Sequence, residues 1–173
     1  MSVNYVIGDA TKPIQTAKQK HVIAHCCNNI GAWGRGFVLA VSALSPLPEK
    51  RYKAWHHGEI GTEFKPGMVQ IVPIPDSNLV VANIIGQDGI RPKRDCAGNM
   101  IPPILYDDLE VGLRKTAMWA SRHNADIHTP RIGCGLAGGD WSIIKDILER
   151  TSVSFGINIF VYDLTEKDKE RYQ

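Results

Sequence analysis

Residues 130–141 of this chain are Pro130-Arg131-Ile132-Gly133-Cys134-Gly135-Leu136-Ala137-Gly138-Gly139-Asp140-Trp141. Residues 125–129, just before this stretch, have the composition of a strand, and residues 141–150 after it have apolar side chains at helical spacing. Four glycines therefore lie between a strand and a helix. Backbone without side chains can direct several N–H groups at one point, and the helix N-terminus adds the positive end of its dipole. The stretch thus predicts a phosphate-binding loop.

Two other interpretations fit the same residues. The first is a plain strand-to-helix turn with Asp140 as the helix N-cap, although such a turn needs fewer glycines. The second is a nicotinamide-dependent oxidoreductase, because Gly133, Gly135 and Gly138 match the dinucleotide-binding fingerprint and Asp163 follows at the end of the next strand. Only ten residues follow Asp163, so the other strands of a doubly wound nucleotide-binding fold would have to come earlier in the chain. This order of elements disfavours the oxidoreductase.

Composition sets limits on the class of protein. A chain of 173 residues with 43% hydrophobic residues predicts a single domain, over residues 1–173, with a full core. The net charge of +2 gives no general case for binding nucleic acid or a membrane. No apolar run approaches the about 18 residues that a membrane span needs, and the N-terminus lacks a signal-peptide pattern. We expect a cytoplasmic monomer.

The four cysteines are Cys26, Cys27, Cys96 and Cys134. An adjacent pair and two single residues do not have the spacing of zinc ligands. They are typical of free thiols in a reducing compartment, and we expect neither a metal nor a cofactor. Cys134 lies near a helix N-terminus, which favours a thiolate; it is either a nucleophile or, as we favour, a small loop residue.

The rest of the chain alternates predicted strands and helices. We expect strands at residues 3–7, 21–27, 68–72, 79–85 and 157–163, and helices at residues 37–44, 49–57 and 106–124. Residues 86–103 are rich in Gly, Pro and charge without periodicity, which predicts a long loop that is functional, mobile or simply solvated. The alternation indicates an α/β fold with a mostly parallel sheet covered by helices on both faces.

A second glycine-rich loop follows the strand at residues 21–27. It is Asn28-Asn29-Ile30-Gly31-Ala32-Trp33-Gly34-Arg35-Gly36, and a helix is predicted directly after it. A strand, a glycine loop and a helix therefore occur twice, and two such loops can hold the two ends of a diphosphate. Asp9 follows the first strand, at the edge of the sheet where α/β proteins bind ligands; its alternative role is to cap a turn.

Four segments, in this order, resemble the macro domain (macrodomain) family: Gly8-Asp9-Ala10, residues 25–36, residues 130–136 and Val161-Tyr162-Asp163. The resemblance covers almost the whole chain. Its branches with the most similar motifs are the ADP-ribose 1''-phosphate phosphatases and the terminal ADP-ribose protein glycohydrolases. It implies a three-layer α/β fold, with a mixed, mostly parallel sheet and helices on both faces.

The resemblance implies ADP-ribose, or an ADP-ribosylated protein, as the ligand. Asp9 would accept a hydrogen bond from the adenine amino group, and Tyr162 would pack on the adenine, with Leu164 beside it. The loop around Gly135 would bind the phosphates, and Asn28 would bind the distal ribose. The full set of implied ligand-binding residues is Gly8, Asp9, Ala10, Asn28, Gly31, Trp33, Gly34, Arg35, Gly36, Ile132, Gly133, Cys134, Gly135, Leu136, Ala137, Tyr162 and Leu164.

Two positions depart from the glycohydrolase pattern. That branch forms a covalent sugar adduct with a lysine after the strand that matches residues 79–85, and this chain has Gly86-Gln87-Asp88 there. It also has an aspartate directly after its Gly-Cys-Gly-Leu motif, where this chain has Ala137. The nearest acid is Asp140, three residues later. The lysine–aspartate mechanism is therefore not expected here.

The resulting hypothesis is a hydrolase that acts at C1'' of the distal ribose without a covalent lysine intermediate. Its catalytic candidates are Asn28, as a ligand of the distal ribose, and His25 or Asp140, as the base for a held water; Asp88 is a third candidate acid. His25 is otherwise a core histidine, and Asp140 a helix cap. The alternative function is a module that binds ADP-ribose and does no chemistry.

Overall fold

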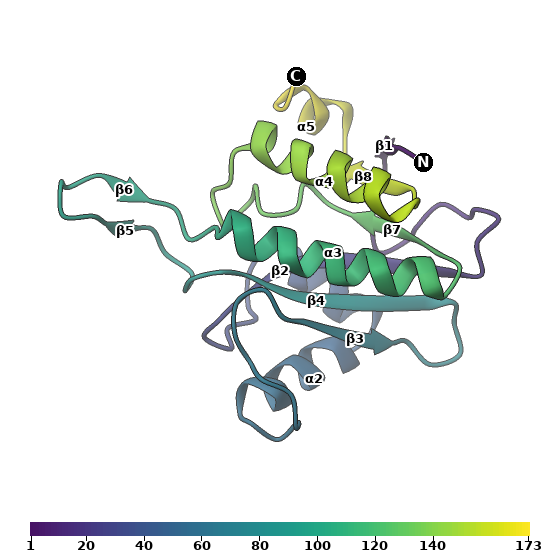
Figure 1. Ribbon diagram of the computed structural model, residues 1–173, viewed down its shortest axis with the longest axis horizontal. Coiled ribbons are helices and arrows are strands. Elements are labelled where there is room, and N and C mark those ends of the chain that lie inside the picture. Colours follow the sequence, from purple (N-terminus) through teal and green to yellow (C-terminus); the bar gives the residue numbers. More distant parts are fainter.

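Six strands form one sheet in the computed structural model, which describes residues 1–173 (Figure 1). The order across the sheet is β1-β8-β7-β2-β4-β3. All neighbouring strands are parallel except β3, which pairs antiparallel with β4. This confirms the mixed, mostly parallel sheet. The strands are β1 (Val3–Ile7), β2 (Lys20–Asn28), β3 (Val69–Pro73), β4 (Leu79–Gln87), β7 (Ala125–Thr129) and β8 (Ile159–Asp163).

Helices cover both faces of the sheet, as expected. The helices are α1 (Val38–Leu44), α2 (Leu47–His56), α3 (Tyr106–Arg122), α4 (Trp141–Phe155) and α5 (Glu166–Glu170). Successive side chains of β2 point to opposite faces. Val22 and Ala24 join the larger core cluster under α3 and α4, whereas Ile23 and Cys27 join the smaller one under α1 and α2. The fold therefore has three layers. None of the helices has both the length and the apolar character that a membrane span requires.

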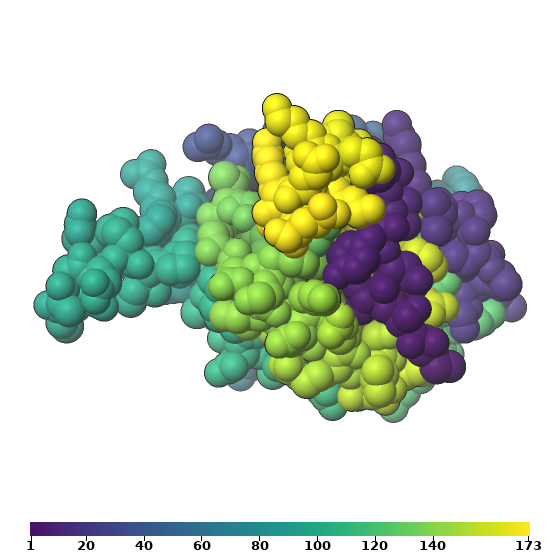
Figure 2. Space-filling view, turned by 90° about the horizontal axis from the view of Figure 1, so that it is seen from above, coloured from purple at the N-terminus to yellow at the C-terminus, as the bar shows by residue number.

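The segment predicted as a loop at residues 86–103 contains more structure than expected. Gly86 and Gln87 extend β4, and a short antiparallel hairpin follows, formed by β5 (Lys93–Arg94) and β6 (Met100–Ile101). Residues 89–103 stand away from the rest of the molecule, and we call them the arm (Figures 1 and 2). No pattern in residues 86–103 predicted the hairpin, because strands of two residues cannot show an alternation of apolar and polar side chains.

The connections after β1, β2, β4, β7 and β8 all leave the same edge of the sheet, because these five strands run parallel. Both glycine-rich stretches are among them. One, residues 29–37, joins β2 to α1 and is called the first loop; the other, residues 130–140, joins β7 to α4 and is called the second loop. This edge holds the candidate site.

Candidate functional site

The first and second loops touch each other across the edge of the sheet. A methyl group added to Gly36, in the first loop, would lie 3.3 Å from Cδ1 of Leu136 in the second. Gly8, after β1, similarly lies against the ring of Tyr162 in β8, and its N–H donates to the carbonyl of Asp163 at 2.8 Å. The structure thus brings four segments that are distant in sequence to one edge of the sheet.

Asn28, the last residue of β2, shapes the first loop. Its Oδ1 accepts hydrogen bonds from the backbone N–H groups of Ile30 and Ala32, both at 3.0 Å, and from the Tyr52 hydroxyl at 2.9 Å. Its Nδ2 donates to the carbonyl of Ala32 at 2.7 Å, and the side chain is buried. The carboxamide oxygen is fully used inside the protein. Only the remaining N–H of Asn28 is left for the predicted bond to a distal ribose.

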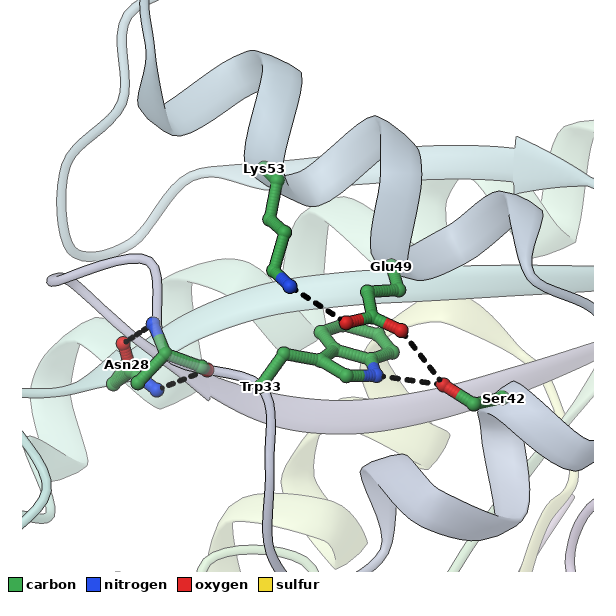
Figure 3. A network of polar contacts seen from close by, with 6 residues as sticks. Asn28, Trp33, Ser42, Glu49 and Lys53 are labelled. Atoms are coloured by element: carbon green, nitrogen blue, oxygen red, sulfur yellow. Dashed lines mark hydrogen bonds and ion pairs between the residues drawn. The ribbon is translucent and has the colours of Figure 1, made fainter.

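Trp33 anchors the first loop in the core under α1 and α2 (Figure 3). Its Nε1 donates to Oγ of Ser42 at 2.8 Å, and that hydroxyl donates to Glu49 at 3.3 Å. Glu49 also pairs with Lys53 at 2.7 Å. The buried indole is therefore an anchor, and its ring is not free to contact a ligand as the resemblance implied.

The exposed part of the first loop is Gly34, Arg35 and Gly36. Their three backbone N–H groups make no hydrogen bond within the chain. Gly36 has φ 81°, a left-handed conformation that favours glycine. This tip has the properties expected of a loop that binds a ligand through its backbone.

The second loop depends on close backbone packing. Gly133, at φ 73°, is buried so tightly that an added methyl group would lie 2.8 Å from Ile104. The N–H of Gly139 donates to the carbonyl of Gly133 at 2.8 Å, which closes the loop on itself. Side-chain-free backbone is required at both positions.

The turn between these two glycines holds Gly135, Leu136 and Ala137, and their three consecutive N–H groups have no acceptor within the chain. Gly135 and Leu136 are exposed. α4 begins directly afterwards, so its positive dipole end lies beside the turn. Two runs of unbonded N–H groups therefore occur at the same edge, one in each loop.

A buried ion pair fixes the start of the second loop. Arg131 donates through Nε and Nη2 to the two carboxylate oxygens of Asp163, at 2.8 and 2.6 Å. Its guanidinium carbon lies 4.9, 4.5 and 4.6 Å from the ring centres of Tyr5, Trp141 and Tyr172. Sequence reasoning missed this anchor. Its signal was an arginine two residues after one strand and an acid at the end of the next. The pairing removes Asp163 from any role as a ribose ligand.

Asp9 combines both roles that the sequence left open. Its Oδ1 accepts from the backbone N–H of Thr11 at 2.8 Å and from the Thr11 hydroxyl at 2.7 Å, which closes the turn after β1. Its Oδ2 makes no hydrogen bond within the chain, and the residue is partly exposed. One oxygen therefore builds the turn while the other is free for a ligand. Ala10, next to it, is buried.

Tyr162 does not present its ring to a ligand. It is 4% exposed, and its hydroxyl lies between the backbone N–H of Ile14, at 3.0 Å, and Nδ1 of His128, at 2.9 Å. Tyr162 is therefore a core residue. Its ring is enclosed by the protein, so the expectation that it packs on adenine is wrong. The exposed apolar side chain at this strand end is that of Leu164.

His25 is enclosed in the core beneath the first loop. It is 2% exposed, its Nε2 lies 2.6 Å from Oδ1 of Asn83, and its ring packs edge-on against that of Trp33. Burial lowers the pKa of His25 to about 4. A side chain in this position has no access to a ligand at the sheet edge. The structure therefore contradicts its expected role as the base and gives it a structural one.

Asp140 is the N-cap of α4, as the plain-turn interpretation predicted. Its Oδ1 accepts from the backbone N–H of Ser142 at 2.8 Å and from the Ser142 hydroxyl at 2.7 Å. These two hydrogen bonds lower the pKa of Asp140, which makes it a weaker base. The geometry gives Asp140 a capping role and no catalytic partner.

The remaining candidates are Cys134, Gln87 and Asp88. Burial raises the pKa of the Cys134 thiol to about 12, so the helix N-terminus does not produce a thiolate. Gln87, in the segment where the resemblance to the glycohydrolases implied a lysine, is buried and donates to the carbonyl of Gly89 at 3.0 Å. Asp88 accepts from Nδ2 of Asn29 at 3.1 Å and pairs with Lys93 at 2.7 Å, and these contacts lower its pKa.

Asp88 is thus a partly exposed acid attached to the first loop. No group of three or more His, Cys, Asp or Glu side chains is arranged to hold a metal ion.

Comparisons of the sequence find relatives among larger and smaller proteins. No protein-family model matches the chain. It is 32% identical over 168 residues to the chromodomain-helicase-DNA-binding protein 1-like of Mus musculus, covering 93% of this chain and 18% of that protein. The chain therefore spans less than a fifth of this relative. It is 21% identical over 166 residues to the ADP-ribose 1''-phosphate phosphatase of Lodderomyces elongisporus, covering 94% of this chain and 100% of that protein.

Solved structures with the same fold include some at higher identity. A Bacteroides thetaiotaomicron protein of unknown function is 43% identical, with a TM-score of 0.85, and the match covers 95% of this chain and 99% of that one. A macrodomain protein from Streptomyces coelicolor is 39% identical, with a TM-score of 0.76, over 93% and 98% of the two chains. Thermosipho africanus DarTG in complex with ADP-ribose, at 17% identity and a TM-score of 0.69 over 93% and 41%, shares the fold.

Proposed function

This chain belongs to the macrodomain family, and from this membership we propose that it binds ADP-ribose, with residues 1–173 acting as a single macrodomain. The observation that carries the proposal is the pair of N–H runs at one edge of the sheet, at 34–36 in the first loop and 135–137 in the second. Backbone N–H groups next to a helix N-terminus are well suited to the oxygens of a diphosphate.

Each end of the ligand then has a recognisable neighbour. The free Oδ2 of Asp9 is an acceptor that suits the amino group of adenine, and Leu164 offers an exposed apolar surface beside it. The distal ribose would lie at the tip of the first loop, near Arg35. Because the loops are held by internal contacts, the site needs little rearrangement on binding, which favours affinity.

Hydrolysis at C1'' is the second candidate function. It is favoured by the full-length match to proteins named ADP-ribose 1''-phosphate phosphatase and by Asp88, the acid attached to the first loop. In this scheme water forms a bond to C1'', its proton passes to Asp88, and the bond from C1'' to the leaving oxygen breaks with its electrons. The lowered pKa of Asp88 makes it a weak base, so turnover would be slow. Gln87 cannot form a covalent sugar adduct.

Calorimetric titration with ADP-ribose tests the binding function. We expect one binding site, and much weaker binding of AMP, which lacks the second phosphate and the distal ribose. Asp9→Asn keeps an oxygen for the turn to Thr11 but replaces the free oxygen with a donor. It should weaken binding about tenfold or more, because a charge-assisted hydrogen bond contributes about 1.5–3 kcal/mol. Absence of ADP-ribose binding by the folded wild-type protein would overturn the proposal.

A product assay separates the binding module from the hydrolase. The substrates are ADP-ribose 1''-phosphate and an ADP-ribosylated protein, and the product is free ADP-ribose. The hydrolase predicts slow release that Asp88→Asn removes while ADP-ribose affinity is kept, and no protein–sugar adduct after treatment with a hydride reductant. If the wild type releases no product from either substrate, the chain is a binding module.

A further inference from the structure

The arm, residues 89–103, is rooted between the two loops of the site. On one side, Asp88 and the N–H of Gly89 bond to the side chain of Asn29 in the first loop, at 3.1 and 2.8 Å. On the other side, the N–H of Ile104 donates to the carbonyl of Ala137 in the second loop at 3.1 Å. The arm therefore leaves the body of the protein at the place where a ligand held by both loops would end.

The arm projects away from the body, and its residues from Ile90 to Ile101 are exposed, apart from the partly buried Asp95 (Figures 1 and 2). Three of its apolar side chains are about half exposed: Ile90, Met100 and Ile101. Exposed apolar side chains that gather on one projecting element are typical of a surface that binds another molecule.

The arm also carries the excess positive charge of the chain. It holds three of the 20 basic residues, Arg91, Lys93 and Arg94, and one of the 18 acidic residues, Asp95. The remainder of the chain is balanced, with seventeen residues of each sign. The Asp95 carboxylate accepts from the N–H groups of Ala97 and Asn99 within the hairpin turn, at 2.9 and 2.8 Å. Lys93 pairs with Asp88 at 2.7 Å and Arg94 donates to the carbonyl of Gly98 at 2.9 Å, whereas the side chain of Arg91 has no hydrogen-bond or ion-pair partner in the chain.

We propose that the arm binds an acidic polypeptide segment that carries the ADP-ribose group, so that the protein recognises the modified protein as well as the modification. This inference rests on the proposed function, since it places the polypeptide at the distal end of the bound ADP-ribose. Charge complementarity selects an acidic partner, and the apolar side chains select one with apolar residues. Residues 89–105 contain no aromatic side chain on which bases could stack, which favours a polypeptide over a nucleic acid.

Cys96 permits a direct test because it is exposed on the arm, whereas the other three cysteines are wholly or partly buried. A fluorophore attached to Cys96 reports on the arm alone. The probe ligand is a twelve-residue peptide of Glu, Asp and Leu, either unmodified or carrying one ADP-ribose through a hydrolysis-resistant linkage on a central serine. The control peptide has Gly and Ser in place of the acidic and apolar residues and is modified in the same way.

We expect the unmodified acidic peptide to change the Cys96 fluorescence and the control peptide to leave it unchanged. The modified acidic peptide should bind about five- to tenfold more tightly than the modified control, as expected for a few exposed charge pairs. The difference should shrink at high salt. The double variant Arg91→Glu, Arg94→Glu should remove the difference in affinity between the two modified peptides, while affinity for free ADP-ribose stays the same. Ile101→Ser should reduce this difference without any change of charge.

Equal affinity of the wild type for the two modified peptides, or a preference that survives Arg91→Glu with Arg94→Glu, would overturn the proposal. A larger response to a single-stranded oligonucleotide than to the acidic peptide would assign the arm to nucleic acid instead. If the proposed function itself is wrong, the wild-type protein will not bind free ADP-ribose. The response of labelled Cys96 to the unmodified acidic peptide decides the role of the arm in that case too.

Discussion

The first and second loops have similar glycine content and follow parallel strands, yet they are held by different interactions. In the first loop, polar side chains turn inward: Asn28 bonds the loop backbone and Tyr52, and Trp33 bonds Ser42. In the second, the backbone packs on itself at Gly133 and Gly139, and one ion pair, Arg131–Asp163, anchors its start. Both loops nevertheless leave three consecutive N–H groups unbonded.

This difference shows how the proposed site for a diphosphate is assembled in a chain with little net charge. The side chains of the two loops are used to hold the backbone in place, and the backbone itself is left to contact the ligand. Mutations of buried anchors should therefore lower stability, whereas mutations of exposed tips should lower affinity.

The largest effect is expected from breaking the anchor of the second loop. Asp163→Asn leaves the Arg131 guanidinium buried without its carboxylate, which should lower the free energy of unfolding by about 3–5 kcal/mol. Urea denaturation measures the loss. The matched control is Lys53→Met, which removes the exposed pair with Glu49 in the first loop's network and should cost less than about 1 kcal/mol. Similar losses for both variants would contradict the comparison.

Breaking the anchor of the first loop should have the next largest effect. Asn28→Ala leaves the N–H groups of Ile30 and Ala32 without their acceptor, whereas the Tyr52 hydroxyl keeps the backbone carbonyl of residue 28 at 2.7 Å, and we expect a loss of about 2–3 kcal/mol in urea denaturation. Tyr52→Phe removes only the hydroxyl that donates to Asn28 and should cost about 1 kcal/mol. If the Asn28→Ala protein is as stable as the wild type, the conformation of the first loop does not depend on the Asn28 side chain.

Acid should weaken the core of the protein at two buried histidines. His25 and His128 have pKa values lowered by burial to about 4 and about 3, from 6.5. The unfolded chain therefore takes up protons first, so stability is complete above pH 6.5 and falls as the pH drops toward these values. At pH 5 each histidine should contribute a loss of about 2 kcal/mol. Unfolding in urea at pH 7 and pH 5 measures it.

The variants for the pH test separate buried from exposed histidines. His25→Gln, which can keep a hydrogen bond to Asn83, should reduce the pH dependence. His123→Gln changes an exposed residue and should leave it as in the wild type. An unchanged pH dependence in His25→Gln would remove that histidine from the explanation.

Changing an exposed tip should affect affinity and leave stability intact. Gly135 has open space around it and no left-handed φ, so Gly135→Val should fold normally. The valine side chain would block the approach of phosphates to the backbone, and ADP-ribose affinity should fall about tenfold or more. Gly34→Val, at the open tip of the first loop, is the matched variant. Calorimetry measures the ADP-ribose affinity of each variant, and thermal denaturation shows whether a variant that loses binding is still folded.

The smallest effect is expected at the N-cap of α4. Asp140→Ala removes the acceptor for the N–H of Ser142, and the midpoint of thermal unfolding should fall by about 2–4 °C. Because hydrogen bonds lower the pKa of Asp140, this contribution is present at neutral pH and is lost as the pH falls through that pKa. A fall in ADP-ribose affinity without a fall in stability would indicate that Asp140 contacts the ligand.

The sequence predicted the regular elements well where their signals are local. Strands β1 and β7 have the predicted bounds, 3–7 and 125–129. Helix α4 extends beyond the predicted residue 150 to Phe155, because its last turn buries the hydroxyls of Thr151 and Ser152, which donate to backbone carbonyls. Polar residues of this kind weaken an apolar pattern in the sequence, although they fit a helix once they are buried and bonded.

The sequence by itself determined that two glycine-rich loops follow parallel strands and that Asp9 follows another, because strand alternation, helical spacing and glycine content are local properties. Only the tertiary structure decided which side chains near those loops are accessible. The environments of His25, Asn28 and Tyr162 are set by Asn83, Tyr52 and His128, which are distant in the sequence. A side chain at the end of a strand faces a ligand or the core according to what packs against it, and packing partners brought together by folding leave no local signal.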